Sequence, residues 1–270
     1  MNDSYIEKSK RFKVFHSSEI GHEKMSRLQE RLIEMLRIVA PILERNGIRY
    51  SLCGGTLLGA AINGKILPWD VDIDICIFDE DYERALRSLQ FSIPDWMMIQ
   101  WTNTEKNYYH GWAKVRDKFS KVSPNSKIYE NNGIWIDLYK LSHVKKSEKE
   151  YLVLKEHLDY LERRCAVGDI SKEEMEKRIM ANDLYNKIEI ERNRASANQA
   201  SANGYIVWSI PIIYIDESCC FPLKRIRFEE VETYSFYDYD NYLKNHYGEH
   251  YKELPPVEQR KIGINDVMFL

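Results

Sequence analysis

The sequence predicts an α+β fold in which a mixed sheet is flanked by helices and carries a helical insertion. With 270 residues, of which 44% are hydrophobic and 30% charged, the chain is long and apolar enough to bury a sizeable core. Segments dense in β-branched and aromatic residues gather in one region, and apolar residues recur at helical spacing before and after it. These observations favour one large globular domain with a helical addition.

The first half of the chain is expected to hold most of the sheet. After an N-terminal extension of residues 1–22, apolar residues recur at helical spacing over residues 23–45, and an Asn-Gly pair then supplies a stop signal. Strands are expected in IRYSLCG, VDIDICIF, HGWAKVRD and GIWIDLYKL, with one helix around residues 80–89. We expect residues 23–144 to form the core of the domain.

The second half is expected to add helices and a short aromatic-rich part. Residues 145–202 are charged and helical in pattern, and a capping box that begins at Ser171 opens the second of two helices. Residues 203–270 are predicted to complete the domain with a strand near residues 205–215 and a short helix that ends before Gly248.

Charge and cysteine content exclude several classes of partner. The 39 Lys and Arg residues against 42 Asp and Glu residues give a net charge of −3, so we expect no nucleic-acid partner. The N-terminus lacks the apolar core of a signal peptide, and the longest apolar run is too short for a transmembrane segment. Five cysteines, an odd number, suit a reducing compartment, so the cytoplasm is expected, with peripheral attachment at the inner face of the membrane as an alternative.

Three aspartates alternate with apolar residues directly after a glycine-rich turn, in the stretch GGTLLGAAINGKILPWDVDIDICI. Side chains of a strand alternate between its faces, so Asp70, Asp72 and Asp74 are expected to share one face. Like charges at this spacing are tolerated if a cation neutralises them or if the strand end is well solvated. Oxygen ligands select a hard ion, so the cation we expect is Mg²⁺ or Mn²⁺.

The turn before the aspartates predicts a phosphate site. Gly54 and Gly55 follow a strand, and Thr56 caps a short helix with the sequence TLLGAAI. Such a turn leaves backbone N–H groups and a helix N-terminus facing the aspartates, and both attract anions. A Gly-Gly turn and an Asp pair are each common without a site, but their combination in one strand–turn–helix–strand unit indicates phosphate chemistry.

This combination resembles the nucleotidyltransferase fold of the polymerase-beta type, in which a small-residue turn precedes Asp-x-Asp and a later strand adds a third carboxylate. The third candidate is Asp137 in GIWIDLYKL, with a surface aspartate of an edge strand as the alternative. The stretch from Gly54 to Asp74 resembles more closely the motif of the LicD/fukutin family. Family-like segments follow in the expected order, namely WAKVRD, WIDLYKL, CCFPLKRIRFEEVE and YLKNHYGEHYKELPP.

The resemblance to the LicD/fukutin family implies a phosphotransferase that moves a phospho-alcohol, such as phosphocholine or ribitol phosphate. The donor would be a CDP-activated alcohol, and CMP would be released. The acceptor would be a hydroxyl of a cell-surface glycan, such as lipopolysaccharide or capsule, in free or lipid-linked form. Matched by position, the metal ligands and catalytic carboxylates are Asp72, Asp74 and Asp137. The phosphate-facing turn is Gly55-Thr56.

The roles of several polar residues stay open at this stage. Asp137 is a candidate base for the acceptor hydroxyl, although the three carboxylate roles can be permuted. Asp70 is either a further ligand or a residue that orients the loop. Lys65 is expected to replace an arginine that the family usually carries three residues earlier. Two further candidates for phosphate contact, with solvated surface cations as the alternative, are Lys114 and Arg116.

Other classes of function remain as alternatives. A glycosyltransferase would hold Mn²⁺ and a nucleotide-sugar with an Asp-x-Asp at a strand end, but it has no need of the Gly-Gly-Thr turn. A catalytically silent binding protein would be favoured by loss of the carboxylates, and all three are present. A nucleotidyltransferase of the same fold would transfer the nucleotide instead of the phospho-alcohol.

The acceptor side of such a site is expected to involve the later regions of the chain. Residues 145–202 and the tyrosines between residues 234 and 251 lie outside the region that carries the donor motifs. Tyrosine rings offer flat apolar faces with hydroxyl tips on which a sugar can stack. Packing of these tyrosines in the core is the alternative.

Overall fold

The computed structural model describes residues 20–123, 128–145, 149–180, 203–207, 213–253, 260 and 262–270. Its elements in the first half are α2 (His22–Arg45), β1 (Tyr50–Leu52), α3 (Gly54–Asn63), β2 (Ile73–Phe78), α4 (Asp79–Ser92), β3 (Met97–Gln100), β4 (Ala113–Asp117), β5 (Ser120–Ser123) and β6 (Trp135–Lys145). Those in the second half are α5 (Lys149–Ala166), α6 (Lys172–Met180), β7 (Asn203–Val207), β8 (Ile213–Asp216), β9 (Lys224–Phe228), β10 (Val231–Ser235), α8 (Tyr239–Tyr247) and β11 (Asp266–Phe269).

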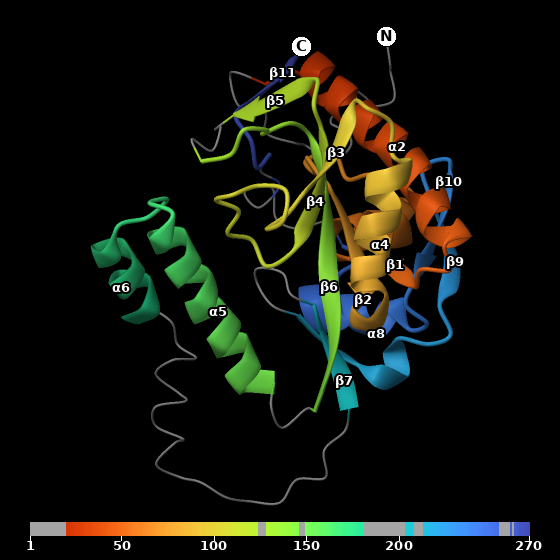
Figure 1. Cartoon of the computed structure of the whole chain (residues 1–270). Helices are drawn as coiled ribbons and strands as arrows, with labels where there is room; N and C mark the ends of the chain where they lie inside the picture. The colour runs from red at the N-terminus through yellow and green to blue at the C-terminus, as the bar shows by residue number, and fades with distance from the viewer. Residues whose placement is uncertain are drawn as a thin grey trace, which may run out of the picture.

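A mixed seven-stranded sheet lies at the centre of the molecule. Five strands follow in the order β1-β2-β6-β4-β3, and β7 pairs with the second half of β6 and with β8. Only β2 and β6 run parallel, and the other neighbours in this sheet are antiparallel. Figure 1 shows the long strand β6 in the middle, with α2 and α4 on one side of it and α5 and α6 on the other. The predicted mixture of a sheet with flanking helices is therefore confirmed.

Helix α2 covers the sheet and also holds the loop that precedes β2. Its apolar residues recur at helical spacing, as the sequence predicts, and eleven residues of the helix are buried. One buried residue is polar: the Nε2 atom of Gln29 donates to the carbonyl oxygens of Leu67 and Asp70, at 2.9 and 3.0 Å. These bonds fix the loop backbone just before the aspartate motif.

The aspartate motif is only partly a strand. Strand β2 begins at Ile73, so Asp70 and Asp72 precede it, and the prediction of one strand that carries all three aspartates is wrong for these two. The backbone of Asp70 makes hydrogen bonds outside the sheet. Its N–H donates to the carbonyl of Leu67, and its own carbonyl accepts from Gln29. Within β2 only Asp74 is partly exposed, and the apolar residues on both faces of the strand are fully buried.

The predicted elements of the second half are present with one difference. Helices α5 and α6 lie in the predicted insertion, and the Glu174 N–H donates to the Ser171 hydroxyl oxygen at 3.1 Å, as the capping box predicts. The single strand near residues 205–215 is wrong, because β7 and β8 form an antiparallel pair in which Tyr205 faces Ile215. A continuous apolar run does not reveal such a reversal of direction.

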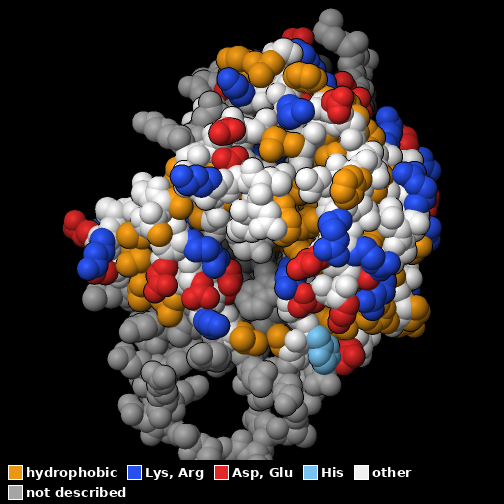
Figure 2. Space-filling view, in the orientation of Figure 1, with side chains coloured by type: hydrophobic (Ala, Val, Ile, Leu, Met, Phe, Trp, Pro, Cys, Tyr) orange, Lys and Arg blue, Asp and Glu red, His pale blue; other side chains and the backbone are white. Residues whose placement is uncertain are grey.

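Several predictions lie partly outside the described residues. These concern most of the N-terminal extension, residues 181–202 of the insertion and the Pro-Pro stop after α8. The division into domains stays a prediction. Within the described ranges, no helix combines the length and the apolar character that crossing a bilayer requires. Figure 2 shows acidic and basic side chains intermixed over the face in view, in keeping with the small net charge.

Candidate active site

Three carboxylates converge at one end of the parallel pair β2–β6. The register of this pair places Asp74 directly beside Asp137. Asp72 lies in the loop just before β2, and its carboxylate joins the same cluster. One carboxylate oxygen from each of the three aspartates lies within 4.8 Å of the other two. The neighbours of Asp137 in β6, Ile136 and Leu138, are fully buried on the opposite face, as predicted.

The carboxylates destabilise one another's charged forms. Burial, followed by the charge of Asp137, raises the pKa of Asp72 to about 7. The pKa of Asp74 is raised well above its usual range by burial and then by the charges of Asp72 and Asp137. Burial and the charge of Asp72 likewise raise the pKa of Asp70. A cation bound among these oxygens would relieve the repulsion, and an all-oxygen ligand set fits Mg²⁺ or Mn²⁺.

The raised pKa of Asp72 predicts that, in the metal-free protein, this residue lowers the free energy of unfolding by an amount that depends on pH. The carboxyl has a reference pKa of 3.8 and a folded-state pKa of about 7, so its ionisation opposes folding as the pH rises between these values. Each pH unit in this window is worth about 1.4 kcal/mol for a fully expressed shift. We therefore expect the Asp72→Asn variant to gain stability relative to wild type between pH 4 and pH 7.

Urea unfolding at pH 4, 5.5 and 7 in the presence of EDTA measures this difference. The comparison with the variant is needed because three histidines have lowered pKa values, namely His110, His157 and His246. They make the folded state more stable as the pH rises over part of this window, which is the opposite of the trend expected from Asp72. A difference in unfolding free energy that stays constant across the three pH values would contradict the electrostatic description of the cluster.

Asp137 is held by three donors from two strands. Its Oδ1 accepts from the Trp112 indole Nε1 at 2.6 Å and from the Lys114 Nζ, and its Oδ2 accepts from the Trp135 indole Nε1 at 2.8 Å. Hydrogen bonding by Trp135 also lowers the pKa of Asp72, which places this indole between two carboxylates. Neither tryptophan is among the residues that the sequence predicts for the site. For Trp135 the period of two is an available signal, since it shares a strand face with Asp137, whereas Trp112 lies just before β4.

The glycine turn packs directly against the carboxylates. Gly54 has a φ of +54°, and a Cβ atom added to it would lie 2.6 Å from the Asp74 Oδ2. A Cβ atom on Gly55 would lie 2.7 Å from the Asp70 Oδ2. The Thr56 hydroxyl oxygen accepts from the Asp74 N–H at 2.9 Å, which ties α3 to the start of β2. The turn therefore needs glycine for its backbone conformation and for its close approach to the acidic groups.

The N-terminus of α3 faces this cluster with free donors. The Gly54 N–H donates to the Tyr242 hydroxyl oxygen at 3.0 Å, so a residue of α8 occupies the first position. Among the described residues, the N–H groups of Gly55 and Thr56 donate no backbone hydrogen bond. Unpaired N–H groups at a helix N-terminus bind anions such as phosphate oxygens.

The three cationic residues singled out in the sequence lie in different surroundings. Lys114 is buried on Asp137, and burial, the largest cause, lowers its pKa although the aspartate opposes this. Arg116 is also buried and donates to the Gln100 Oε1 and the Gly133 carbonyl, at 2.8 and 2.7 Å. Lys65 lies beyond the C-terminal end of α3, with its Nζ 3.6 Å from Glu229. Its ion pair is with Glu229 and not with an aspartate of the cluster.

The tyrosines of the C-terminal part divide into buried and exposed groups. Tyr242 and Tyr251 are almost completely buried, whereas Tyr237 and Tyr247 are about two-fifths exposed. The pKa of Tyr247 is raised by burial of its hydroxyl and by the charges of Asp70 and Asp74. Tyr247 of α8 is therefore a side chain that is open to solvent and also close to the acidic cluster.

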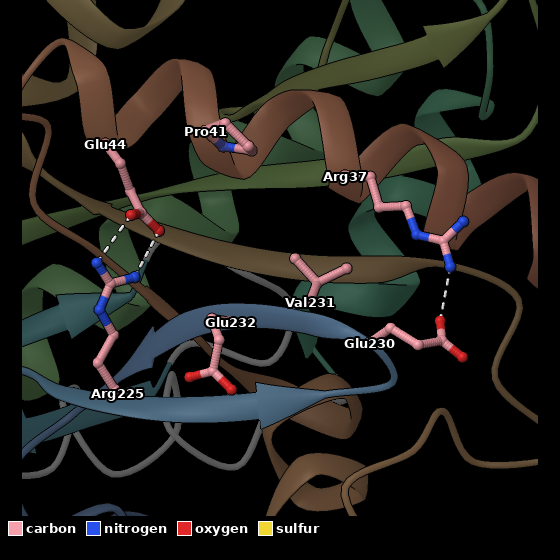
Figure 3. Close-up of a pocket in the computed structure, with 7 residues that line it drawn as sticks. All are labelled: Arg37, Pro41, Glu44, Arg225, Glu230, Val231 and Glu232. Carbon is pink, nitrogen blue, oxygen red and sulfur yellow. Dashed lines mark hydrogen bonds and ion pairs between the residues drawn. The ribbon is translucent and has the colours of Figure 1, made fainter.

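A separate groove lies on another part of the surface. It is lined by residues of α2 and of the β9–β10 hairpin and has a volume of about 610 Å³ (Figure 3). Its arginines are paired, because Arg225 donates to Glu44 at 2.8 and 2.9 Å and Arg37 donates to Glu230 at 2.6 Å. None of the residues that line it belongs to the predicted site, so we do not connect it with the carboxylate cluster.

The segment that contains this site matches a family of known proteins. Residues 47–168 match the family described as LicD/FKTN/FKRP, nucleotidyltransferase domain. The ribitol 5-phosphate transferase FKRP of Mus musculus is 54% identical over 112 residues, which are 40% of this chain and 20% of that protein. The lipopolysaccharide cholinephosphotransferase LicD of Haemophilus influenzae is 46% identical over 43 residues, which are 16% of each chain.

A further relative is the uncharacterised protein RT0683 of Rickettsia typhi, which is 27% identical over 127 residues. That match covers 42% of this chain and 40% of the relative, so the matched region is well under two thirds of each of these relatives. The family match from residue 47 to residue 168 contains the glycine turn, all four aspartates and both tryptophans of the site.

Proposed function

Since residues 47–168 match the family described as LicD/FKTN/FKRP, nucleotidyltransferase domain, we propose that this protein is a metal-dependent transferase of phospho-alcohols. It would move a phospho-alcohol from a CDP-activated donor onto a glycan hydroxyl and release CMP. The observation that carries the proposal is the convergence of three carboxylates beside the free N–H groups of a helix N-terminus. We also propose that the mixed sheet has the nucleotidyltransferase fold of the polymerase-beta type.

The chemistry named for two relatives supports the choice of reaction. One is a ribitol 5-phosphate transferase and the other a cholinephosphotransferase, so both move an alcohol together with its phosphate. The two alcohols differ in charge and in hydroxyl content. The site described here, with acidic groups and backbone donors, addresses the phosphate part that both reactions share.

Each group at the site has a role in this proposal. Asp72, Asp74 and Asp137 would hold Mg²⁺ or Mn²⁺, which would neutralise charge that develops on the phosphate oxygens during transfer. The N–H groups of Gly55 and Thr56 would bind oxygens of the same diphosphate. We propose metal binding rather than proton acceptance as the role of Asp137, because its carboxylate lies in one cluster with those of Asp72 and Asp74.

The compartment we propose is the cytoplasm or the inner face of its membrane. The five cysteines are free, and four of them are buried. Free thiols are typical of a reducing compartment, in which CDP-activated donors would also have to be available. A lipid-linked glycan would be reached from the inner face.

A direct test is incubation of the full chain with Mg²⁺ and a panel of CDP-alcohols and nucleotide-sugars. We expect release of CMP from at least one CDP-alcohol, and faster release when a glycan acceptor is added. Release of a nucleoside diphosphate from a nucleotide-sugar would instead support a glycosyltransferase. Transfer of the CMP group itself to the acceptor would support a nucleotidyltransferase of the same fold.

Donor binding should also stabilise the folded protein. Because the Gly55 and Thr56 N–H groups and the metal would grip the same diphosphate, we expect CDP-alcohols to raise the melting temperature only when Mg²⁺ is present. A ligand at 100 times its dissociation constant adds about 2.7 kcal/mol to stability. Differential scanning fluorimetry with and without EDTA measures this effect. UDP-sugars are the matched control ligands, and an equal shift with them would contradict the proposed donor class.

A further inference from the structure

The buried lysine next to the carboxylates is part of a row that crosses three strands. The parallel pairing of β2 with β6 places Asp74 beside Asp137, and the antiparallel pairing of β4 with β6 places Lys114 on the other side of Asp137. The Lys114 and Asp137 side chains are 7% and 4% exposed. Lysine is almost never fully buried without a partner, and the partner of Lys114 is Asp137. The ion pair is therefore part of the structure of the sheet itself.

Two tryptophans fix both members of the ion pair. Each indole N–H donates to Asp137, one to each carboxylate oxygen. The Lys114 Nζ lies 5.6 Å from the ring centroid of Trp112 and 5.1 Å from that of Trp135. Cation–π contacts at these distances favour an ammonium ion between the rings. The ammonium is therefore held in place independently of any ligand.

The donors leave Asp137 little capacity for metal binding. A carboxylate has about four lone-pair directions, two on each oxygen. On Oδ1, both directions are used, by Trp112 and by Lys114, whereas on Oδ2 one is used by Trp135. Asp137 can therefore give one further bond, through Oδ2, to one ion. A second metal ion bound by Asp137 would need a free direction on Oδ1, and Trp112 and Lys114 occupy both of these directions.

Lys114 brings a positive charge into direct contact with the three-carboxylate cluster, through its ion pair with Asp137. Arg116, the next cation on β4, is directed to Gln100 and to a backbone carbonyl rather than to the cluster.

We propose that Lys114 takes the place of a second metal ion, so that the site binds one divalent cation and the ammonium supplies the other positive charge. This inference rests on the proposed metal-dependent function and adds the number of ions and the role of the lysine. Lys114 is then a positioning residue, which acts by holding one oxygen of Asp137 and by fixing a positive charge in the sheet.

The test is the number of Mn²⁺ ions that the full chain binds at saturation, measured by equilibrium dialysis and by electron paramagnetic resonance. Binding by the Asp72→Asn/Asp74→Asn double variant gives the background from other surface carboxylates. Above this background we expect one Mn²⁺ per wild-type chain. The Lys114→Met variant, which frees Oδ1 and removes the ammonium, should bind two, with spin coupling between them. The Lys118→Met variant, at an exposed lysine just after β4, is the matched control and should bind one.

The outcomes separate this inference from the proposed function. Absence of specific Mn²⁺ binding by wild type would overturn the metal-dependent function itself. Two specific ions in wild type would leave that function standing but overturn the role of Lys114. One ion in both wild type and Lys114→Met would likewise show that the lysine does not exclude a second ion. Lys114→Gln is a second variant with a neutral side chain, and the wild-type count tests the inference even if both variants fail to fold.

Discussion

Replacement of Asp72 or Asp74 by Asn is expected to lower transferase turnover by about 1,000-fold or more while the fold survives. A metal ion contributes several kcal/mol of stabilisation to developing charge, and each 1.4 kcal/mol is about tenfold in rate. Either substitution removes one charged ligand from a cluster of three. Because the lost charge repels its neighbours in the metal-free protein, the variant should be at least as stable as wild type at pH 7.

Turnover of a CDP-alcohol and a thermal unfolding curve measure the two halves of this expectation. The Asp95→Asn variant is the control, because this aspartate is exposed and lies outside the carboxylate cluster. It should change neither turnover nor stability by a measurable amount. Turnover within tenfold of wild type in Asp72→Asn or Asp74→Asn would show that these residues are not metal ligands for the reaction.

Substitution of Gly54 by Ala is expected to give the second-largest loss, at least 100-fold in turnover together with a loss of stability. The new Cβ atom would meet the Asp74 Oδ2 at 2.6 Å, so the carboxylate or the turn has to move by roughly 1 Å. A displacement of this size at a reacting centre costs about 100-fold in rate. The positive φ of +54° adds about 1–2 kcal/mol of backbone strain for a residue with a Cβ atom.

A second glycine separates the contact from the strain. Gly47 has a φ of +62°, but a Cβ atom added to it would meet nothing within 4 Å. The Gly47→Ala variant should therefore lose about 1–2 kcal/mol of unfolding free energy and keep its turnover. If both variants lost turnover equally, the effect of Gly54→Ala would reflect general destabilisation rather than displacement of Asp74.

Local patterns in the sequence predict the backbone of the site well. The helical spacing in residues 22–45 and the β-branched density around β2 and β6 depend on neighbouring residues, and the structure has these elements close to the predicted positions. The strand faces follow as well, since a period of two assigns Asp137 and the buried Ile136 to opposite sides. Asp74 lies beside Asp137 because β2 and β6 pair in parallel, whereas Asp72 joins them from the loop before β2, and neither fact is contained in a local pattern.

The partners of the site residues depend on contacts between distant parts of the chain. Trp112 reaches Asp137 because β4 and β6 are antiparallel neighbours, and no local pattern states which strands pair. Gln29 contacts the Asp70 backbone across 41 positions, and Tyr242 contacts Gly54 across 188. Lys65 is a similar case, because its side chain pairs with Glu229, which is distant in the sequence, rather than with the aspartates that follow it.

The hydrogen bond between Gly54 and Tyr242 limits how freely the segment with the glycine turn and the aspartates can be exchanged between proteins. The segment that the family match covers, residues 47–168, begins after α2 and ends before α8. A transplant of this segment alone would bring the acidic motif without Gln29, which anchors the loop, and without the phenol that receives the first helix N–H. We therefore expect chimeras to fold around the segment only when the recipient supplies equivalents of both flanking helices. The part of the chain that must be transferred together is therefore longer than the segment that matches the family.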